Sequence, residues 1–164
     1  MNALVSSWQT FFSAEVGASA ALTGLVMVAA SVNLPRIMTH ELLPGRAAEA
    51  VIALGGALVL SSLLLLPGQP AMAQGIECGL IGVLSLAAPF TFQLHAHRSS
   101  VPNSEARPVV RAMLSSLVGV PLVVAGGFLV AGAAEGLYWA AAGLILSLVV
   151  GIIGAWVLLV EINR

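Results

Sequence analysis

Apolar residues in this chain fall into five long stretches that are separated by short polar connectors. The stretches cover residues 10–32, 47–66, 76–94, 109–133 and 137–160. A bilayer core about 30 Å thick requires roughly 20 apolar residues of α-helix, and each stretch is close to that length. The pattern therefore predicts an all-α, polytopic transmembrane helical bundle with five spans. We expect residues 1–164 to form a single transmembrane domain.

The arginines lie in alternate connectors, and this placement predicts how the spans are oriented. The first connector contains Arg36 and Arg46, the third region contains Arg98, Arg107 and Arg111, and the chain ends at Arg164. Cytoplasmic connectors are enriched in Arg and Lys, so we expect the N-terminus outside and the C-terminus in the cytoplasm. A four-span arrangement without residues 76–94 would put the first two groups of arginines on opposite sides of the membrane. The charge pattern therefore favours five spans.

Composition supports a membrane protein and excludes several other classes. Hydrophobic residues make up 59% of the chain and charged residues 8%, compared with roughly 45–50% and about 25% in soluble domains. A soluble domain of this size could not bury so much apolar surface. The net charge of −1 provides no field that attracts nucleic acid. Because no catalytic motif is present, we also expect no enzymatic activity and no cofactor.

Polar residues inside the first apolar stretch are the strongest functional candidates. Glu15, Ser19, Thr23 and Ser31 follow one another at helical spacing, and Asn33 ends the stretch. Ionisable groups at membrane depth are costly and usually functional, so this stripe is a candidate lining for a water-filled ion path. In a second interpretation, the hydroxyls bond to carbonyls of their own helix and Glu15 reaches the outer headgroup water.

Other polar residues carry weaker signals. Glu77 lies in the first turn of the third stretch, where it is either an N-terminal helix charge or a second outer acid beside Glu15. His95 and His97 lie near one connector and His40 lies in another on the same side. A spacing of two residues turns the rings of His95 and His97 about 200° apart on a helix. We therefore expect solvated histidines, with metal binding or pH sensing as the minority interpretation.

Small residues recur at spacings that permit close helix packing in lipid. Gly143, Ser147 and Gly151 are four residues apart in the last stretch, and Gly17 belongs to a similar series in the first. These faces could meet another helix of this chain, a second copy or a different protein. Pro121, with Gly126 and Gly127 beyond it, predicts either a static kink or a hinge in the fourth stretch.

Two adjoining segments resemble a group of small bacterial integral membrane proteins that are largely uncharacterised. The resemblance covers about residues 20–69 and rests on AALTGLVMVAASVNLPRIM and LPGRAAEAVIALGGALVLSSLLLLPGQ. It implies a multi-pass protein of the bacterial inner (plasma) membrane. It implies no substrate and no site.

Taken together, these patterns lead to one functional hypothesis and two alternatives. The first is a homo-oligomer in the lipid bilayer that forms a pathway for an ion (a cation or proton) or a small solute. We expect an oligomer because the predicted spans of one copy are too few to enclose a wide pathway. The second is an accessory or regulatory subunit that packs against a larger membrane complex. The third is a binder of lipid or of another hydrophobic ligand.

Overall fold

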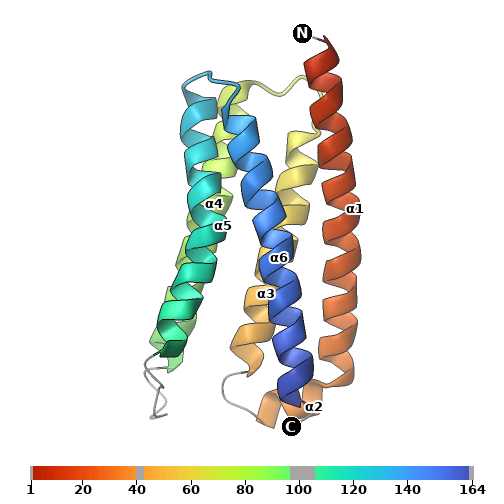
Figure 1. Ribbon diagram of the computed structural model, residues 1–164, viewed down its shortest axis with the longest axis vertical. Coiled ribbons are helices and arrows are strands. Elements are labelled where there is room, and N and C mark those ends of the chain that lie inside the picture. The colour runs from red at the N-terminus through yellow and green to blue at the C-terminus, as the bar shows by residue number, and fades with distance from the viewer. Residues whose placement is uncertain (1, 40–42, 97–105, 163–164) are drawn as a thin grey trace. The chain divides into compact units, whose positions relative to one another are not determined.

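The computed structural model describes residues 2–39, 43–96 and 106–162, and all the regular structure in these ranges is helical (Figure 1). The helices are α1 (Asn2–Val32), α2 (Leu34–Thr39), α3 (Leu43–Leu64), α4 (Ala71–Ala96), α5 (Ala106–Val130) and α6 (Gly136–Ile162). The all-helical prediction is therefore confirmed. Each of the five apolar stretches coincides in the main with one of the long helices.

The structure corrects the predicted boundaries in the connectors. Helix α2 lies within the connector between the first two apolar stretches. Its Ile37 is 3% exposed and packs against Ala30 and Ala47, and the Ile37 amide donates to the carbonyl of Asn33 at 3.0 Å. One buried apolar side chain thus helps to hold a short helix within this connector. Helix α3 correspondingly begins four residues earlier than expected.

Helix α5 ends three residues earlier than the apolar stretch that predicted it. The amide of Gly132 donates to the carbonyl of Leu129 at 3.0 Å, and the amide of Ala133 donates to that of Phe128 at 2.9 Å. Gly132 has a φ of 78°. This is the Schellman arrangement, in which a left-handed glycine ends a helix. The apolar residues beyond Val130 belong to that turn.

Three helical segments in the described ranges are long and apolar enough to cross a membrane. They are Trp8–Val32 in α1, Ala47–Leu64 in α3 and Gly136–Trp156 in α6. Helices α4 and α5 contain shorter apolar segments, Ala71–Ala87 and Ser116–Val130. The structure is consistent with a membrane location.

The chain divides into two compact units. Unit 1 contains Met1–Pro70 and Ser147–Arg164, and unit 2 contains Ala71–Leu146. The predicted single domain stays a prediction. Each unit has its own close helix packing and is described by itself.

Unit 1 is built from α1, α3 and the second part of α6, with α1 and α3 antiparallel (Figure 1). Its centre is formed by Val26, Ala50 and Leu54. Leu22 of α1 and Leu148 of α6 pack against these three residues. Gly151 of α6 lies directly against Leu54, because a Cβ added to Gly151 would lie 2.5 Å from Leu54 Cδ2. The absence of a side chain at this glycine is what admits Leu54.

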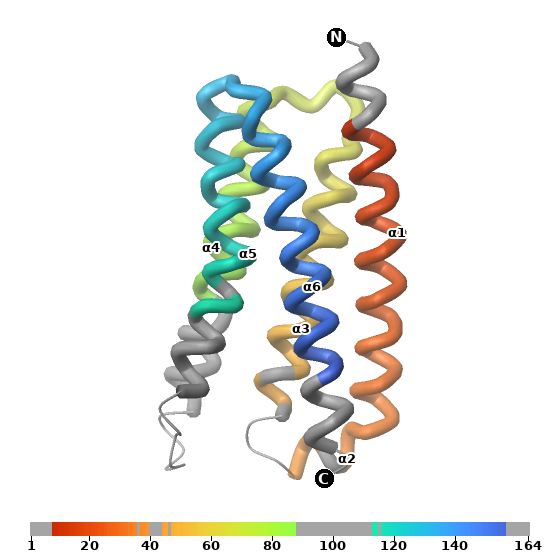
Figure 2. Tube along the Cα trace, viewed as in Figure 1, coloured from red at the N-terminus to blue at the C-terminus, as the bar shows by residue number. Residues whose placement is uncertain are grey.

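Unit 2 is built around the pair α4 and α5, whose glycines bring the two backbones together (Figure 2). A Cβ added to Gly126 would lie 2.7 Å from the carbonyl oxygen of Gly75 and 2.8 Å from the amide nitrogen of Gly79. A Cβ added to Gly119 would lie 2.8 Å from the carbonyl oxygen of Gly82. Small residues at these positions permit the two helix backbones to approach closely.

The predicted packing residues divide into two groups. Gly151 contacts Leu54 in unit 1, and a Cβ added to Gly143 would lie 2.5 Å from Leu122 Cδ2 in unit 2. Ser147 is buried. Gly17, in contrast, is exposed, and nothing in the part of the chain that the structure describes lies within 4 Å of a Cβ added there. Its expected role in packing stays a prediction.

The fourth apolar stretch forms one continuous helix through Pro121. Of the two glycines beyond it, Gly126 is held against the backbone of α4, while Gly127 faces open space in the described part of the chain. This packing favours the static interpretation at Gly126. The hinge stays a prediction.

Candidate functional site

Four buried polar side chains belong to unit 1. Among the described residues they are Glu15, Ser19, Ser61 and Ser147, of which Glu15 is 6% exposed and Ser61 is 0% exposed. They come from three helices: Glu15 and Ser19 from α1, Ser61 from α3, and Ser147 from α6. A buried polar group in an apolar bundle is costly unless it is paired. These residues are therefore the candidate site.

Helix register brings Glu15 and Ser61 to the same level of unit 1. Leu22 of α1 packs against the group that contains Leu54 of α3. Glu15 precedes Leu22 by seven residues and Ser61 follows Leu54 by seven residues. Seven residues are about two helical turns. Because α1 and α3 are antiparallel, moving back from Leu22 to Glu15 on α1 and moving forward from Leu54 to Ser61 on α3 lead toward the same end of unit 1. Glu15 and Ser61 consequently lie within about one turn of each other, on the buried faces of α1 and α3.

Glu15 and Ser61 share a second property: each has a buried polar side-chain atom without a hydrogen-bond partner among the described residues. Glu15 Oε2 and Ser61 Oγ are buried and have no hydrogen-bond partner among the residues that the structure describes. Ser19 differs, because its Oγ donates to the carbonyl oxygen of Glu15 at 2.6 Å and approaches that of Val16 at 3.2 Å. Unpartnered buried polar atoms are rare in proteins. Glu15 Oε2 and Ser61 Oγ are therefore the atoms of this site that are available to a ligand.

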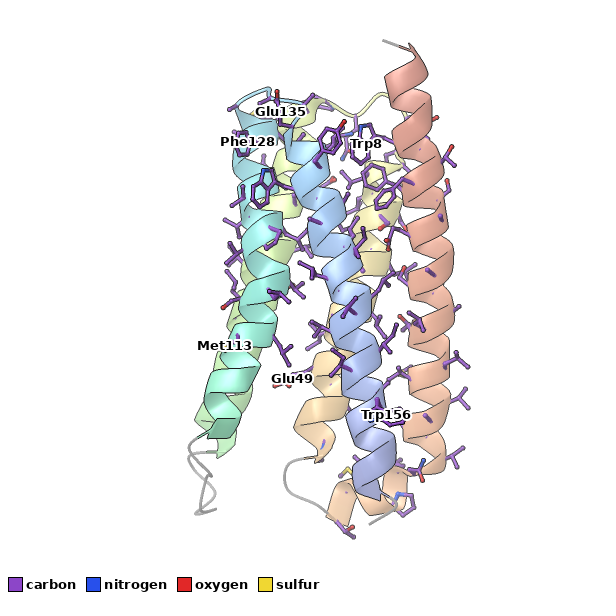
Figure 3. All side chains as sticks on the ribbon, viewed as in Figure 1. Trp8, Glu49, Met113, Phe128, Glu135 and Trp156 are labelled. Atoms are coloured by element: carbon purple, nitrogen blue, oxygen red, sulfur yellow. The ribbon has the colours of Figure 1, made fainter. Side chains whose placement is uncertain are left out.

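An aromatic group precedes Glu15 on α1. Trp8, Phe11 and Phe12 contact one another, with ring centroids 5.4–5.9 Å apart. Phe12 is 2% exposed and precedes Glu15 by three residues, so the two side chains are neighbours on the helix surface. Figure 3 shows Trp8 and Trp156 at opposite ends of unit 1, as expected for interfacial anchors. The aromatic group lies between Glu15 and that end along α1.

The remaining residues of the predicted stripe bond to their own helix. Thr23 Oγ1 donates to the carbonyl of Ser19 at 2.7 Å, and Ser31 Oγ donates to that of Met27 at 2.7 Å. Asn33 Nδ2 donates to the carbonyl of Ala29 at 2.9 Å. The second interpretation predicted such bonds for the hydroxyls. Its other half, that Glu15 reaches the outer headgroup water, stays a prediction, although Glu15 is only 6% exposed.

The other candidate residues do not add to this site. Glu77 belongs to unit 2, and its role as a second outer acid stays a prediction. His40 and His97 lie outside the described residues, and the structure describes only the backbone of His95. Within the described ranges, no three His, Cys, Asp or Glu residues are placed to hold a metal ion.

Sequence reasoning missed Ser61 as a site residue and treated Ser147 only as a packing residue. A signal was present for Ser61, which follows the apolar Leu54 by seven residues and so shares its face of α3. Without the packing of α1 on α3, nothing distinguished that face from the others. Comparisons with protein-family models, curated proteins and solved structures found no match to this chain. The resemblance to bacterial membrane proteins stays a prediction.

Proposed function

We propose that this protein moves an ion (a cation or proton) or a small solute across a membrane, and that Glu15 is the residue that binds it on the way. The observation that carries the proposal is the buried Glu15 carboxyl, whose Oε2 has no partner among the described residues and which lies level with the unpartnered Ser61 Oγ. A protein retains such a group at membrane depth when it serves a pathway or relay.

The topology that we propose has five spans, with the N-terminus outside and the C-terminus in the cytoplasm of a bacterium. Support comes from the five long helices and from the arginines, which lie in or beside alternate connectors and at position 164. In this topology, the aromatic group of Trp8, Phe11 and Phe12 lies on the outer side of Glu15. An ion would then reach Glu15 from outside only when that group moves.

Glu15→Gln is expected to reduce ion flux into liposomes that contain the purified protein by at least tenfold, because an amide can carry neither the negative charge nor an exchangeable acidic proton. The measurement is flux per protein, followed with ion-sensitive dyes. Glu135→Gln is the matched control, since Glu135 is exposed in the turn between α5 and α6. Wild-type vesicles that stay impermeable to every ion tested would rule out the proposal, as would equal flux in wild type and Glu15→Gln.

We also propose that the active form is a homo-oligomer. Gly17 and Gly24 leave open space along an exposed face of α1 in the described part of the chain, and small residues permit close helix association in lipid. Native mass measurement in mild detergent should give one closed multimer of this chain. Reproducible co-purification of larger chains would support an accessory subunit instead, and retained lipid on a monomer would support a lipid binder.

A further inference from the structure

We infer that α1 and α3 form a second version of the α4–α5 pair, and that the contact between α1 and α3 parts to admit a ligand at Glu15 and Ser61, whereas the contact between α4 and α5 stays closed. The inference deepens the proposed function, and it rests on that function only for its last experiment. Three observations support it, which are the burial along each helix, the register within each pair and the residue types at equivalent positions. Each pair of helices is considered by itself.

Burial along the helices follows one pattern in both pairs. Three buried residues of α1 have buried counterparts 63 positions later in α4, and five buried residues of α3 have buried counterparts 65 positions later in α5. The α1 residues are Phe12, Glu15 and Ser19, and their counterparts are Gly75, Cys78 and Gly82. The α3 residues are Leu54, Ala57, Leu60, Ser61 and Leu64, and their counterparts are Gly119, Leu122, Ala125, Gly126 and Leu129. The two pairs therefore bury equivalent faces.

The register within each pair agrees with this correspondence. In α1 and α3, Glu15 and Ser61 lie level with each other. In α4 and α5, a Cβ added to Gly126 would lie 2.8 Å from the amide nitrogen of Gly79, which is the residue after Cys78. Cys78 and Gly126 are thus level with each other as well. Because these two residues are the counterparts of Glu15 and Ser61, the candidate site has an equivalent level in unit 2.

Residue types differ between the pairs at the positions where their helices face each other. In α4 and α5, four glycines lie directly against the backbone of the opposite helix, and these are Gly75, Gly82, Gly119 and Gly126. Their counterparts in α1 and α3 are Phe12, Ser19, Leu54 and Ser61. Backbone thus meets backbone in α4 and α5, whereas side chains lie between α1 and α3. A side chain can change its rotamer to make room, but a backbone cannot turn aside.

The closed contact between α1 and α3 also leaves polar atoms unsatisfied. Glu15 Oε2 and Ser61 Oγ are buried without a hydrogen-bond partner among the described residues, which costs stability. A ligand or a water molecule that enters between the two helices supplies the missing hydrogen bonds. At the equivalent level of α4 and α5, Gly126 has no side chain and Cys78 carries a thiol, which behaves as a small apolar group. Of the two pairs, parting is therefore favoured in α1 and α3.

Cysteine labelling tests this difference, because Ser61 and Cys78 are both 0% exposed and burial alone predicts equally slow reactions. Wild type has Cys78 as its single cysteine, and Ser61→Cys is made together with Cys78→Ala. In detergent, the small reagent aminoethyl methanethiosulfonate should modify Ser61→Cys about tenfold or more faster than Cys78, because local opening exposes only the first position. Each rate, from intact-protein mass spectrometry, is divided by that of the same protein unfolded in SDS. Equal rates would overturn the inference.

Ala50→Cys, also made with Cys78→Ala, is the matched control within unit 1. Ala50 is 3% exposed and packs against α6, since a Cβ added to Gly154 would lie 3.1 Å from Ala50 Cβ. It should react as slowly as Cys78 in wild type. Fast reaction at both Ala50→Cys and Ser61→Cys would show that unit 1 opens as a whole, and it would also overturn the inference.

The last experiment connects the opening to transport. Ser61→Cys is labelled in detergent and reconstituted for the liposome assay, where its ion flux should fall about tenfold or more compared with the same variant before labelling, because the adduct occupies the place of the ligand. Ser62→Cys is the control, since Ser62 is exposed and donates to the carbonyl of Leu58 at 2.8 Å; it should be labelled and keep its flux.

Unchanged flux in fully labelled Ser61→Cys would exclude the contact between α1 and α3 as the place of the ligand. If wild type moves no ion at all, the proposed function fails, and the ratio of labelling rates in detergent still decides whether α1 and α3 part.

Discussion

Gly126→Val is expected to destabilise the protein by about 3 kcal/mol or more, whereas the neighbouring Gly127→Val variant should keep close to wild-type stability. A Cβ at position 126 would lie 2.7 Å from the carbonyl oxygen of Gly75 and 2.8 Å from the amide nitrogen of Gly79. Both atoms belong to the backbone of α4, so no side chain can turn aside to make room. At position 127, nothing described lies within 4 Å.

Cys78 reports on this prediction directly. It is the single cysteine of the chain, it is 0% exposed, and it lies in α4 beside Gly79. A thiol-reactive dye should therefore label Cys78 only when α4 separates from its surroundings. Gly126→Val should be labelled at a markedly lower temperature than wild type, and Gly127→Val at nearly the same temperature. Equal labelling curves for the two variants would contradict the close packing of α4 on α5.

Leu54→Ala is expected to cost about 2–5 kcal/mol, because it removes a fully buried side chain from the centre of unit 1. Gly151→Ala alone should cost about 1–3 kcal/mol through overpacking, since its Cβ would lie 2.5 Å from Leu54 Cδ2 and Cγ. The double variant should cost clearly less than the sum, because Leu54→Ala makes room for the added methyl group. This non-additivity is the mark of direct contact.

SDS titration followed by tryptophan fluorescence measures these free energies of unfolding. Ile52→Ala is the control for Leu54→Ala, since Ile52 lies on the same helix and is 40% exposed. Gly55→Ala is the control for Gly151→Ala, because nothing described lies within 4 Å of a Cβ at Gly55. Additive costs in the double variant would show that Leu54 and Gly151 do not contact each other.

The long helices could be predicted because a long run of apolar residues is a local property of the sequence. About 20 apolar residues in a row are sufficient for a span, whatever the rest of the chain does. Helix α2 could not be predicted in the same way, because Ile37 is held by Ala30 and Ala47. Those contacts join residues on both sides of the connector, and no local pattern contains them.

The candidate site was predictable only in part. Glu15 is recognisable from sequence because it is an acid within an apolar stretch. The rest of the expected stripe was recognisable too, but Thr23, Ser31 and Asn33 bond to their own helix. Ser61 carries no local sign of function, because serine is common in apolar helices. Only the packing register of α1 against α3 places Ser61 level with Glu15 and so makes it a candidate site residue.

The sequence by itself determined that the chain forms long apolar helices and that one acid lies within an apolar stretch. These properties depend on composition and on spacing along one helix. Only the tertiary structure decided which glycines bring backbones together, which hydroxyls are already bonded, and which residue lies level with Glu15. The physical reason is that contacts between helices depend on how each helix is rotated about its own axis and how far it is shifted along a partner helix that is distant in sequence. Close packing, rather than any local pattern, sets that rotation and register.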